Sequence, residues 1–249
     1  MTDAIRFENL GHAYVPGAWI FRRYAAAIPK GSICAVLGPN GRGKTTLLKA
    51  LLGLQRPTEG RVSLTGGRAF VPQLFSVTFS YSVLQMVLMG RAGKIGLFSQ
   101  PSRADERMAM RALERFELAE LAHRPFDALS GGQRQLVIVA RALVAEADIL
   151  VLDEPTSALD LKNQALMLAW MRRLSAEDGL TVLFTTHHPH HALAVADNVL
   201  LMQETERYVF GPAGDVLTET ALERLYGVPI RRIAYRYAGR EMETLIPVL

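Results

Sequence analysis

The sequence predicts an α/β fold with a parallel sheet covered by helices on both faces, an antiparallel β part near the N-terminus and an inserted helical subdomain. Two observations lead to this prediction. The apolar stretches 32–37, 147–153 and 181–186 have the length and composition of buried strands, and helical segments alternate with them. From about residue 74 to 145 the alternation gives way to a helical pattern, which indicates the insertion.

Composition limits the class of protein. Hydrophobic residues make up 49% of the 249 residues, which is ample for a core, and the formal net charge of +4 does not demand a nucleic-acid partner. The single cysteine, Cys34, cannot form an internal disulfide, so we expect a buried thiol in a reducing, intracellular setting. Residues 1–10 lack the apolar region of a secretory signal, and no run of about 18 apolar residues predicts a membrane span.

The stretch 38–46, GPNGRGKTT, fits the pattern G-x-x-x-x-G-K-[ST] of a phosphate-binding loop. It lies between an apolar strand at 32–37 and a helix predicted at 46–52. Glycines let the backbone approach a triphosphate, and the helix points its unpaired N–H groups and positive dipole end at the phosphates. The lysine can reach the β- and γ-phosphates, and the following hydroxyl can ligate Mg²⁺. The residues expected to bind here are Gly38, Asn40, Gly41, Gly43, Lys44, Thr45 and Thr46.

Local pattern, turn residues and caps predict the other elements. Before the phosphate loop we expect strands at 4–10 and 21–28, with a loop at 11–16 that carries Tyr14. Ser102 is expected to be the N-cap of a helix that runs to about Phe116. The remaining predictions are strands at 61–64, 68–72, 198–202 and 207–210, helices at 82–89, 133–143, 161–174 and 217–226, and a helical turn at 118–122. Residues 228–249 give no prediction.

A second anion-binding helix start is predicted at 129–133, LSGGQ. Ser130 can cap the helix that follows, and the glycines expose the first N–H groups of that helix. The chain therefore carries two phosphate-binding helix starts, whereas a simple enzyme with a phosphate loop needs only one.

These two motifs, followed by ILVLDEP at 149–155, resemble the nucleotide-binding subunit of ABC transporters. The resemblance covers about residues 3–226, and all the motifs occur in the family's order. It implies a RecA-like P-loop NTPase core, ATP hydrolysis as the activity, and ATP with Mg²⁺ as cofactors. It also implies a single ABC ATPase domain over 1–249, divided into a catalytic core at 1–75 and 146–227, a helical subdomain with the signature motif at 76–145, and a C-terminal tail at 228–249.

The resemblance assigns roles to residues outside the phosphate loop. Tyr14 resembles the aromatic residue that stacks on adenine, and Gln73 the glutamine that approaches Mg²⁺ and the attacking water. Asp153 resembles the Mg²⁺-directed acid, Glu154 the general base, and His187 the switch histidine on the γ-phosphate. Independently of the family, Glu154 directly follows the last residue of an apolar strand and is placed to polarise a water. A positioned base contributes typically about 10²–10⁴-fold.

In the second motif, Ser130, Gly132 and Gln133 resemble the signature that binds the γ-phosphate held by the opposite subunit. Asp160, in the sequence SALD at 157–160, resembles the loop that crosses the dimer. The resemblance thus implies a homodimer that sandwiches two Mg-ATP, and each site combines one phosphate loop with the signature of the other chain.

Two assignments stay open at this point. Tyr14 can also be read as an ordinary surface aromatic, and Trp19 or Tyr24 could take its place at the base. The run HHPHH at 187–191 could suggest a metal site, but Pro189 breaks the helical register and no cysteine or acid lies at ligand spacing. The family uses only His187, so we expect the other histidines, His188, His190 and His191, on the following helix and surface.

The lack of a membrane segment, a second cassette or a coiled coil favours an importer ATPase that docks on a separate permease. The stretches 70–75, 81–91 and 184–189 resemble the large-permease importers for iron chelates, vitamin B12 and molybdate, and most of all the molybdate/tungstate group. Iron–siderophore import is the second interpretation, and a soluble ATP-switched regulator or nucleic-acid maintenance ATPase is a third. The expected partners are two copies of a polytopic permease and, indirectly, a periplasmic substrate-binding protein, without nucleic acid. We expect the chain at the cytoplasmic face of the inner membrane, with the segment after Gln73 facing the permease.

Overall fold

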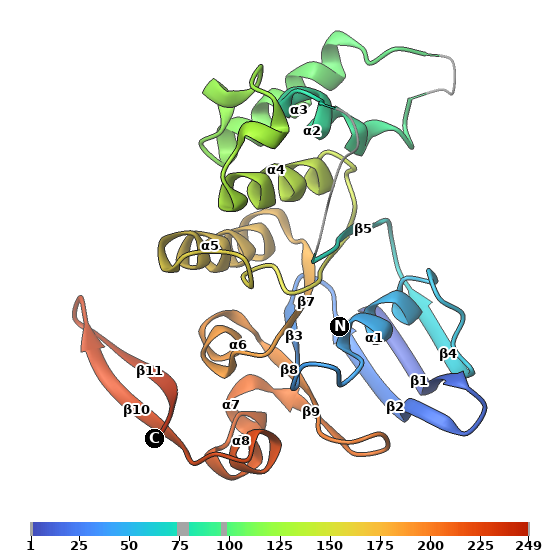
Figure 1. Ribbon diagram of the computed structural model, residues 1–249, viewed down its shortest axis with the longest axis vertical. Helices are drawn as coiled ribbons and strands as arrows, with labels where there is room; N and C mark the ends of the chain where they lie inside the picture. The colour runs from blue at the N-terminus through green and yellow to red at the C-terminus, as the bar shows by residue number, and fades with distance from the viewer. Residues whose placement is uncertain (1, 74–79, 96–98, 249) are drawn as a thin grey trace. The chain divides into compact units, whose positions relative to one another are not determined.

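The computed structural model describes residues 2–73, 80–95 and 99–248. It divides into two compact units, one formed by Met1–Thr65 with Leu168–Leu249 and the other by Gly66–Met167 (Figure 1). The second unit therefore includes two strands in addition to the helices expected at 76–145. The part of the permease-facing segment at 74–79 lies outside the described residues, as do residues 96–98. Within the described ranges, no helix is both long and apolar enough to cross a bilayer.

An antiparallel sheet opens the first unit, with strand order β2-β1-β4. Its strands are β1 Asp3–Val15, β2 Ala18–Pro29 and β4 Glu59–Leu64. The predicted loop at 11–16 is wrong, because β1 pairs with β2 as far as Val15 opposite Ala18. Gly17, with φ of +85°, supplies the turn between β1 and β2. Register shifts along β1 interrupt the alternation of apolar and polar residues, so the sequence pattern does not reveal the full strand.

The unit also contributes four strands to a second sheet, in the order β7-β3-β8-β9. The bounds are β3 Ile33–Leu37, β7 Thr181–Thr186, β8 Asn198–Met202 and β9 Tyr208–Pro212. β3 pairs in parallel with β7 and β8, and every residue of β3 and β7 is buried. This burial explains why β3 is a continuous apolar run and why β7 has apolar residues on both faces at 182–184, as expected for a parallel sheet. Cys34 lies in β3, where burial raises the pKa of its thiol to about 12.

Helices connect these strands. α1 Lys44–Leu51 follows β3, and α6 Pro189–Val195 follows β7. The helix predicted at 217–226 is α8 Glu219–Tyr226, which Thr218 caps, and a short helix that was not predicted, α7 Ala213–Val216, precedes it. α5 Leu161–Asp178 begins in one compact unit and ends in the other.

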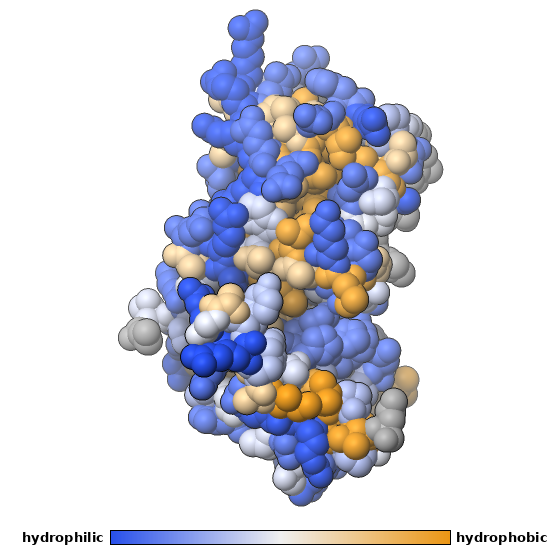
Figure 2. Space-filling model, turned by 90° about the vertical axis from the view of Figure 1, so that its left-hand side faces the viewer, coloured by the Kyte–Doolittle hydropathy of each residue, from blue (hydrophilic) through white to orange (hydrophobic). Residues whose placement is uncertain are grey.

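The C-terminal tail forms a hairpin of β10 Ile230–Tyr237 and β11 Arg240–Pro247. Ile230 and Leu245 are buried at its base. One face of the hairpin carries exposed apolar side chains, namely those of Ile233, Tyr235, Tyr237, Met242 and Ile246. Figure 2 views the side from which the hairpin projects and shows apolar residues among the hydrophilic ones there.

The second unit combines two parallel strands with a group of helices. The strands are β5 Arg68–Val71 and β6 Ile149–Leu152, and the helices are α2 Val83–Leu88, η1 Met89–Arg91, α3 Arg103–Arg115, η2 Ala119–Leu121, η3 Phe126–Ala128 and α4 Gly131–Leu143. Ser82, Ser102 and Ser130 each begin a helix with a capping box, so the predicted caps at Ser102 and Ser130 are confirmed. Arg91 ties the helices together by binding Asp105 at 2.9 Å and the carbonyl of Val144 at 3.0 Å.

Candidate functional site

The phosphate loop leaves the end of β3 and turns into α1. Gly43 is the N-cap of α1 at φ +96°, and α1 has no side-chain cap. A Cβ at Gly43 would collide with Cγ2 of Ile20 on β2, so only glycine fits this approach. Lys44 is buried, and its Nζ donates hydrogen bonds to the carbonyls of Gly38 at 2.9 Å and Pro39 at 3.2 Å. The lysine charge thus lies inside the curve of the loop, beside the uncapped helix start.

His187 leaves the neighbouring strand at the same edge. Leu37 of β3 pairs with Thr186 of β7, so the phosphate loop and His187 begin next to each other. The Tyr226 hydroxyl donates to the His187 carbonyl at 2.9 Å, and the His188 amide donates to Thr186 Oγ1 at 3.0 Å. These bonds hold the backbone of the turn that presents the imidazole.

The structure distinguishes among the three aromatic candidates for the base. Tyr14 is 62% exposed, and its hydroxyl lies 3.1 Å from Oγ1 of Thr46 in the first turn of α1. That hydrogen bond is the main cause of a lowered pKa of Tyr14. Tyr24 is fully buried, stacks on Tyr208 and is unavailable to a ligand. The Trp19 ring is covered by the guanidinium of Arg22 at 4.4 Å. Of the three rings, Tyr14 is the one open beside the phosphate loop.

In the second unit, the acidic pair follows β6. Val71 of β5 pairs with Leu152 of β6, and the Asp153 amide donates to the Val71 carbonyl at 2.9 Å, so Gln73 and the acids leave one edge. Asp153 is 2% exposed. Glu154 has φ of +46°, an uncommon conformation for a residue with a Cβ. Glu117 and Glu146 share this region, so what marks Glu154 is its place directly after the buried strand β6.

The signature motif lies at the start of α4. Ser130 Oγ accepts from the Gln133 amide at 3.3 Å, and the Gln133 side chain accepts from the Ser130 amide at 3.1 Å. A Cβ on Gly132 would meet the side chain of Asn163, which lies in the first turn of α5. Asp160 Oδ1 accepts from the Asn163 amide at 2.8 Å and so begins α5. The two loops that the resemblance assigns to a dimer contact are therefore neighbours within this unit.

The four histidines at 187–191 also come together. Neighbouring rings lie with centroids 4.0 to 5.3 Å apart, and His191 is buried on α6. Burial, followed by the charges of the other imidazoles, lowers the pKa of His191 to about 3. Among the residues that the structure describes, no group of three or more His, Cys, Asp or Glu side chains is arranged to hold a metal ion.

Sequence reasoning missed residues that contact these motifs. His12 and Gln55 surround Tyr14, and Asn163 packs on Gly132. Only His12 gives a local signal, because it lies two residues from Tyr14 on the same strand. Gln55 and Asn163 come from distant segments, and no motif marks them.

A glycine-rich loop between a buried strand and an uncapped helix, with a buried lysine inside it, defines a P-loop nucleotide-binding protein. The ABC transporter family model matches residues 21–157. The chain is 44% identical over 248 residues to the molybdate import ATP-binding protein MolC of Haemophilus influenzae, covering 100% of this chain and 98% of that protein. It is 37% identical to the manganese transport ATP-binding protein MntB of Bacillus subtilis, covering 90% of this chain and 92% of that one.

Solved structures agree with this result. A protein described as a metal-chelate type ABC transporter, in an inward-facing conformation, superimposes with a TM-score of 0.94 at 41% identity and covers 100% of this chain and 98% of its own. An ATP-binding cassette solved as a dimer with ADP and Pi matches with a TM-score of 0.72 at 27% identity, over 82% of this chain and 97% of its own. The chain belongs to the ABC transporter family and is one of its ATP-hydrolysing subunits. The predicted fold class and family are thereby confirmed.

Proposed function

We propose that this chain powers the import of a molybdate- or tungstate-type oxyanion through a separate membrane permease. The observation that carries the proposal is the 44% identity, over essentially the full length of both chains, to a molybdate import ATP-binding protein. The subunit would act at the cytoplasmic face of the inner membrane, and a periplasmic binding protein would deliver the cargo to the permease. Nucleic acid has no place in this cycle.

The residues of the phosphate loop would bind ATP. Lys44 would neutralise phosphate charge, and the amides of the loop and of α1 would hold the phosphate oxygens. The exposed ring of Tyr14 would stack on adenine, and His187 would contact the γ-phosphate. Glu154 would accept a proton from the attacking water, and Gln73 would orient that water. This division of roles follows the general logic of phosphoryl transfer, in which positioning and charge stabilisation supply most of the catalysis.

The residues assigned to Mg²⁺ fit a hard cation, because Thr45, Gln73 and Asp153 offer a hydroxyl, an amide and a carboxylate oxygen. Asp153 lies at the carboxyl end of β6, the edge of a parallel sheet where ligands bind in such folds. Bound Mg²⁺ would supply charge neutralisation on the β- and γ-phosphates.

The working unit in this proposal is a homodimer. Ser130, Gly132 and Gln133 of one copy would bind the γ-phosphate held by the other copy, and Asp160 would lie at the dimer contact. The exposure of Ser130 supports this arrangement, as does the dimeric cassette to which the chain is similar. Two copies of the permease would complete the transporter.

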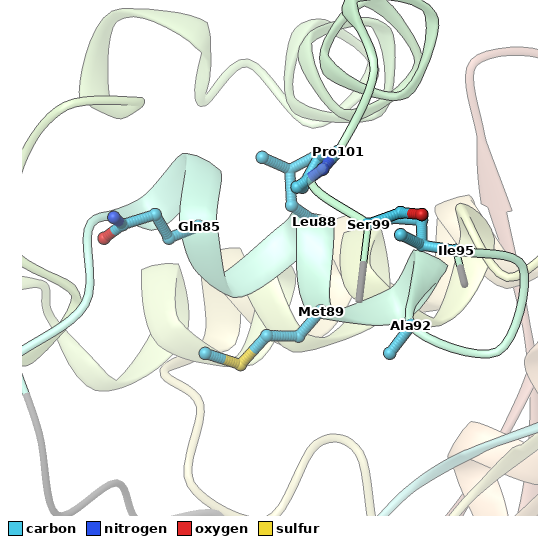
Figure 3. Close-up of a pocket in the computed structure, with 7 residues that line it drawn as sticks. All are labelled: Gln85, Leu88, Met89, Ala92, Ile95, Ser99 and Pro101. Carbon is cyan, nitrogen blue, oxygen red and sulfur yellow. The ribbon is translucent and has the colours of Figure 1, made fainter. Parts of the chain in front are cut away.

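A groove in the second unit is suited to a permease helix. Its volume is about 390 Å³, and its lining residues are Gln85, Leu88, Met89, Ala92, Ile95, Ser99 and Pro101. Figure 3 shows Leu88 directed toward Pro101 and Ile95 beside Ser99, on the elements that follow Gln73 in the chain. A mainly apolar groove accepts the apolar side of a short helix, so this surface is our choice for the permease contact.

Glu154→Gln tests the catalytic assignment. The variant keeps the shape of the side chain and removes the base, so we expect normal ATP binding and a loss of steady-state ATPase of about 10²–10⁴-fold. Glu117→Gln is a matched control, because Glu117 also has a positive φ (+59°) but follows α3. Normal turnover in Glu154→Gln, or an equal loss in Glu117→Gln, would refute the base assignment.

Uptake in a strain that lacks the chain tests the cargo. We expect loss of molybdate uptake, restored by the wild-type chain and not by Glu154→Gln. The second candidate is a ferric chelate, favoured by the 36% identity to a Helicobacter pylori protein named "probable iron chelatin transport ATP-binding protein". Loss of ferric-chelate uptake with molybdate uptake intact would replace the first proposal by the second.

A further inference from the structure

Tyr14 combines an exposed ring with a fixed hydroxyl. The ring is 62% exposed, yet the hydroxyl lies 3.1 Å from Thr46 Oγ1 and 3.4 Å from Gln55 Oε1. An exposed tyrosine without such contacts samples several rotamers and loses that freedom when a ligand binds. The Tyr14 side chain is therefore fixed by its hydroxyl, while its ring remains exposed to a ligand.

A buried imidazole supports the ring from the side. His12 is 6% exposed and meets Tyr14 edge-on, with centroids 4.9 Å apart and an interplanar angle of 84°. Its Nε2 lies 2.7 Å from Nε2 of Gln55, the same side chain that contacts the Tyr14 hydroxyl. Its Nδ1 has no hydrogen-bond partner in the part of the chain that the structure describes. A buried unpartnered nitrogen costs stability, so an imidazole at this point indicates a purpose other than stability.

The segment that carries Gln55 is itself clamped to β1. Thr58 Oγ1 accepts from the Ala13 amide at 3.0 Å, and the Thr58 amide donates to the Gly11 carbonyl at 2.8 Å. The backbone on both sides of His12 is thereby fixed to the loop after α1. The position of the Tyr14 ring follows from this set of bonds and needs no ligand.

We infer that His12 and Gln55 are positioning residues for the nucleotide base, and that the Tyr14 hydroxyl sets the ring in its stacking position before ATP arrives. The inference rests on the proposed stacking of Tyr14 on adenine. Because the hydroxyl bonds to Thr46, the base platform has a fixed position relative to the first turn of α1, where the phosphates bind. A nucleotide joins a base and a triphosphate in one molecule, so it then meets both sites without the cost of ordering the Tyr14 side chain.

The experiment compares a nucleotide with a ligand that lacks the base. The Mg²⁺ complexes of a non-hydrolysable ATP analogue and of tripolyphosphate are titrated calorimetrically into wild type, Tyr14→Phe and Gln55→Leu. We expect both variants to bind the nucleotide about 2- to 10-fold more weakly, the effect of ordering one side chain on binding. Affinity for tripolyphosphate stays unchanged. Tyr237→Phe is the control, because Tyr237 is an exposed tyrosine on the C-terminal hairpin.

A third variant separates this inference from the stacking proposal. Tyr14→Ala removes the ring, and we expect nucleotide affinity to fall by about 5- to 100-fold with tripolyphosphate affinity unchanged. If Tyr14→Ala binds the nucleotide like wild type, the stacking proposal itself fails. If Tyr14→Ala is weak while Tyr14→Phe and Gln55→Leu match wild type, stacking stands and the positioning role is refuted. An equal loss for tripolyphosphate in Tyr14→Phe would also overturn the inference, because the hydroxyl would then act on the phosphate loop.

Discussion

The chain contains two glycine-rich helix starts that differ in how their first amides are satisfied. At α1 the N-cap is Gly43 in the left-handed region, and no side chain caps the helix. At α4 the N-cap is Ser130 in extended geometry, and a reciprocal capping box with Gln133 engages two amides. α1 therefore begins without a side-chain cap, whereas α4 begins with a cap formed by its own side chains.

This difference fits the two proposed tasks. A loop that wraps the whole triphosphate of its own subunit benefits from a helix start that no side chain caps. A helix start that meets a phosphate only when two subunits close must hold its shape while it is open to solvent. α4 resembles α2 and α3 in this respect, because all three begin with a serine capping box. What distinguishes α4 from them is the pair of glycines after the serine.

Substituting the glycines gives the largest expected contrast. Gly43→Ala places a Cβ against Ile20 at a positive φ, so we expect a loss of about 1–3 kcal/mol from backbone strain and a further loss of about 1–3 kcal/mol from overpacking. Nucleotide binding falls with it, because the loop must shift. At Gly131 the nearest atom to a Cβ is the Ala158 carbonyl oxygen at 3.8 Å, an ordinary contact.

Gly131→Ala is accordingly the matched control, with a change in unfolding free energy of within about 0.5 kcal/mol and normal nucleotide binding to the isolated subunit. Chemical denaturation and nucleotide titration measure both quantities. If the two variants lost equal stability, the contrast between a helix start without a side-chain cap and a self-capped one would not hold.

Removing a cap gives the next effect. Ser130→Ala and Ser82→Ala delete the same group, since each serine forms a box with a glutamine three residues later. We expect each to cost about 0.5–2 kcal/mol of stability. Only Ser130→Ala should reduce the ATPase of the assembled homodimer, by about 10- to 100-fold, because only that hydroxyl is assigned to a phosphate. If Ser130→Ala and Ser82→Ala had similar ATPase activity, Ser130 would act only as a helix cap.

The sequence predicts most of the framework because its elements are marked locally. β7 and β8 have the predicted bounds, since buried apolar runs end at polar or turn residues. β1 is longer than predicted because the pairing of residues 11–15 depends on partners in β2 and β4 that no local pattern reveals. The C-terminal hairpin was not predicted, since most of its residues are exposed and no buried apolar run marks its strands.

The candidate site divides in the same way. The phosphate loop, the signature and the acidic pair are contiguous motifs, so their residue types and spacing carry the signal. The support of Tyr14 by Gln55 joins residues 41 positions apart and depends on how the segment after α1 pairs with β1. Likewise, the close approach of Asn163 to Gly132 depends on how α4 and α5 pack, so the sequence does not reveal it. Contacts of this kind follow from tertiary structure and have no counterpart in a motif.

Acid titration of the capping boxes gives the smallest effect. The box of α3 has Asp105 where those of α2 and α4 have glutamine. Hydrogen bonds from the hydroxyl and amide of Ser102, followed by Arg91, lower the pKa of Asp105 to about 2. Because the folded-state pKa lies below the ordinary value near 3.9, the unfolded chain takes up the proton first as the pH falls. The contribution of Asp105 is therefore complete above about pH 4 and is lost as the pH falls toward 2.

Urea unfolding between pH 5 and 2 measures this dependence. We expect the stability difference between wild type and Asp105→Asn to shrink as the pH falls through this window. Gln85→Glu in α2 introduces a carboxylate at the corresponding position and should add a new loss of stability in acid, because a carboxylate that caps a helix has a lowered pKa. A constant difference between wild type and Asp105→Asn at every pH would mean that the carboxylate is not what stabilises α3. The serine alone would then account for the stabilisation of α3 by its capping box.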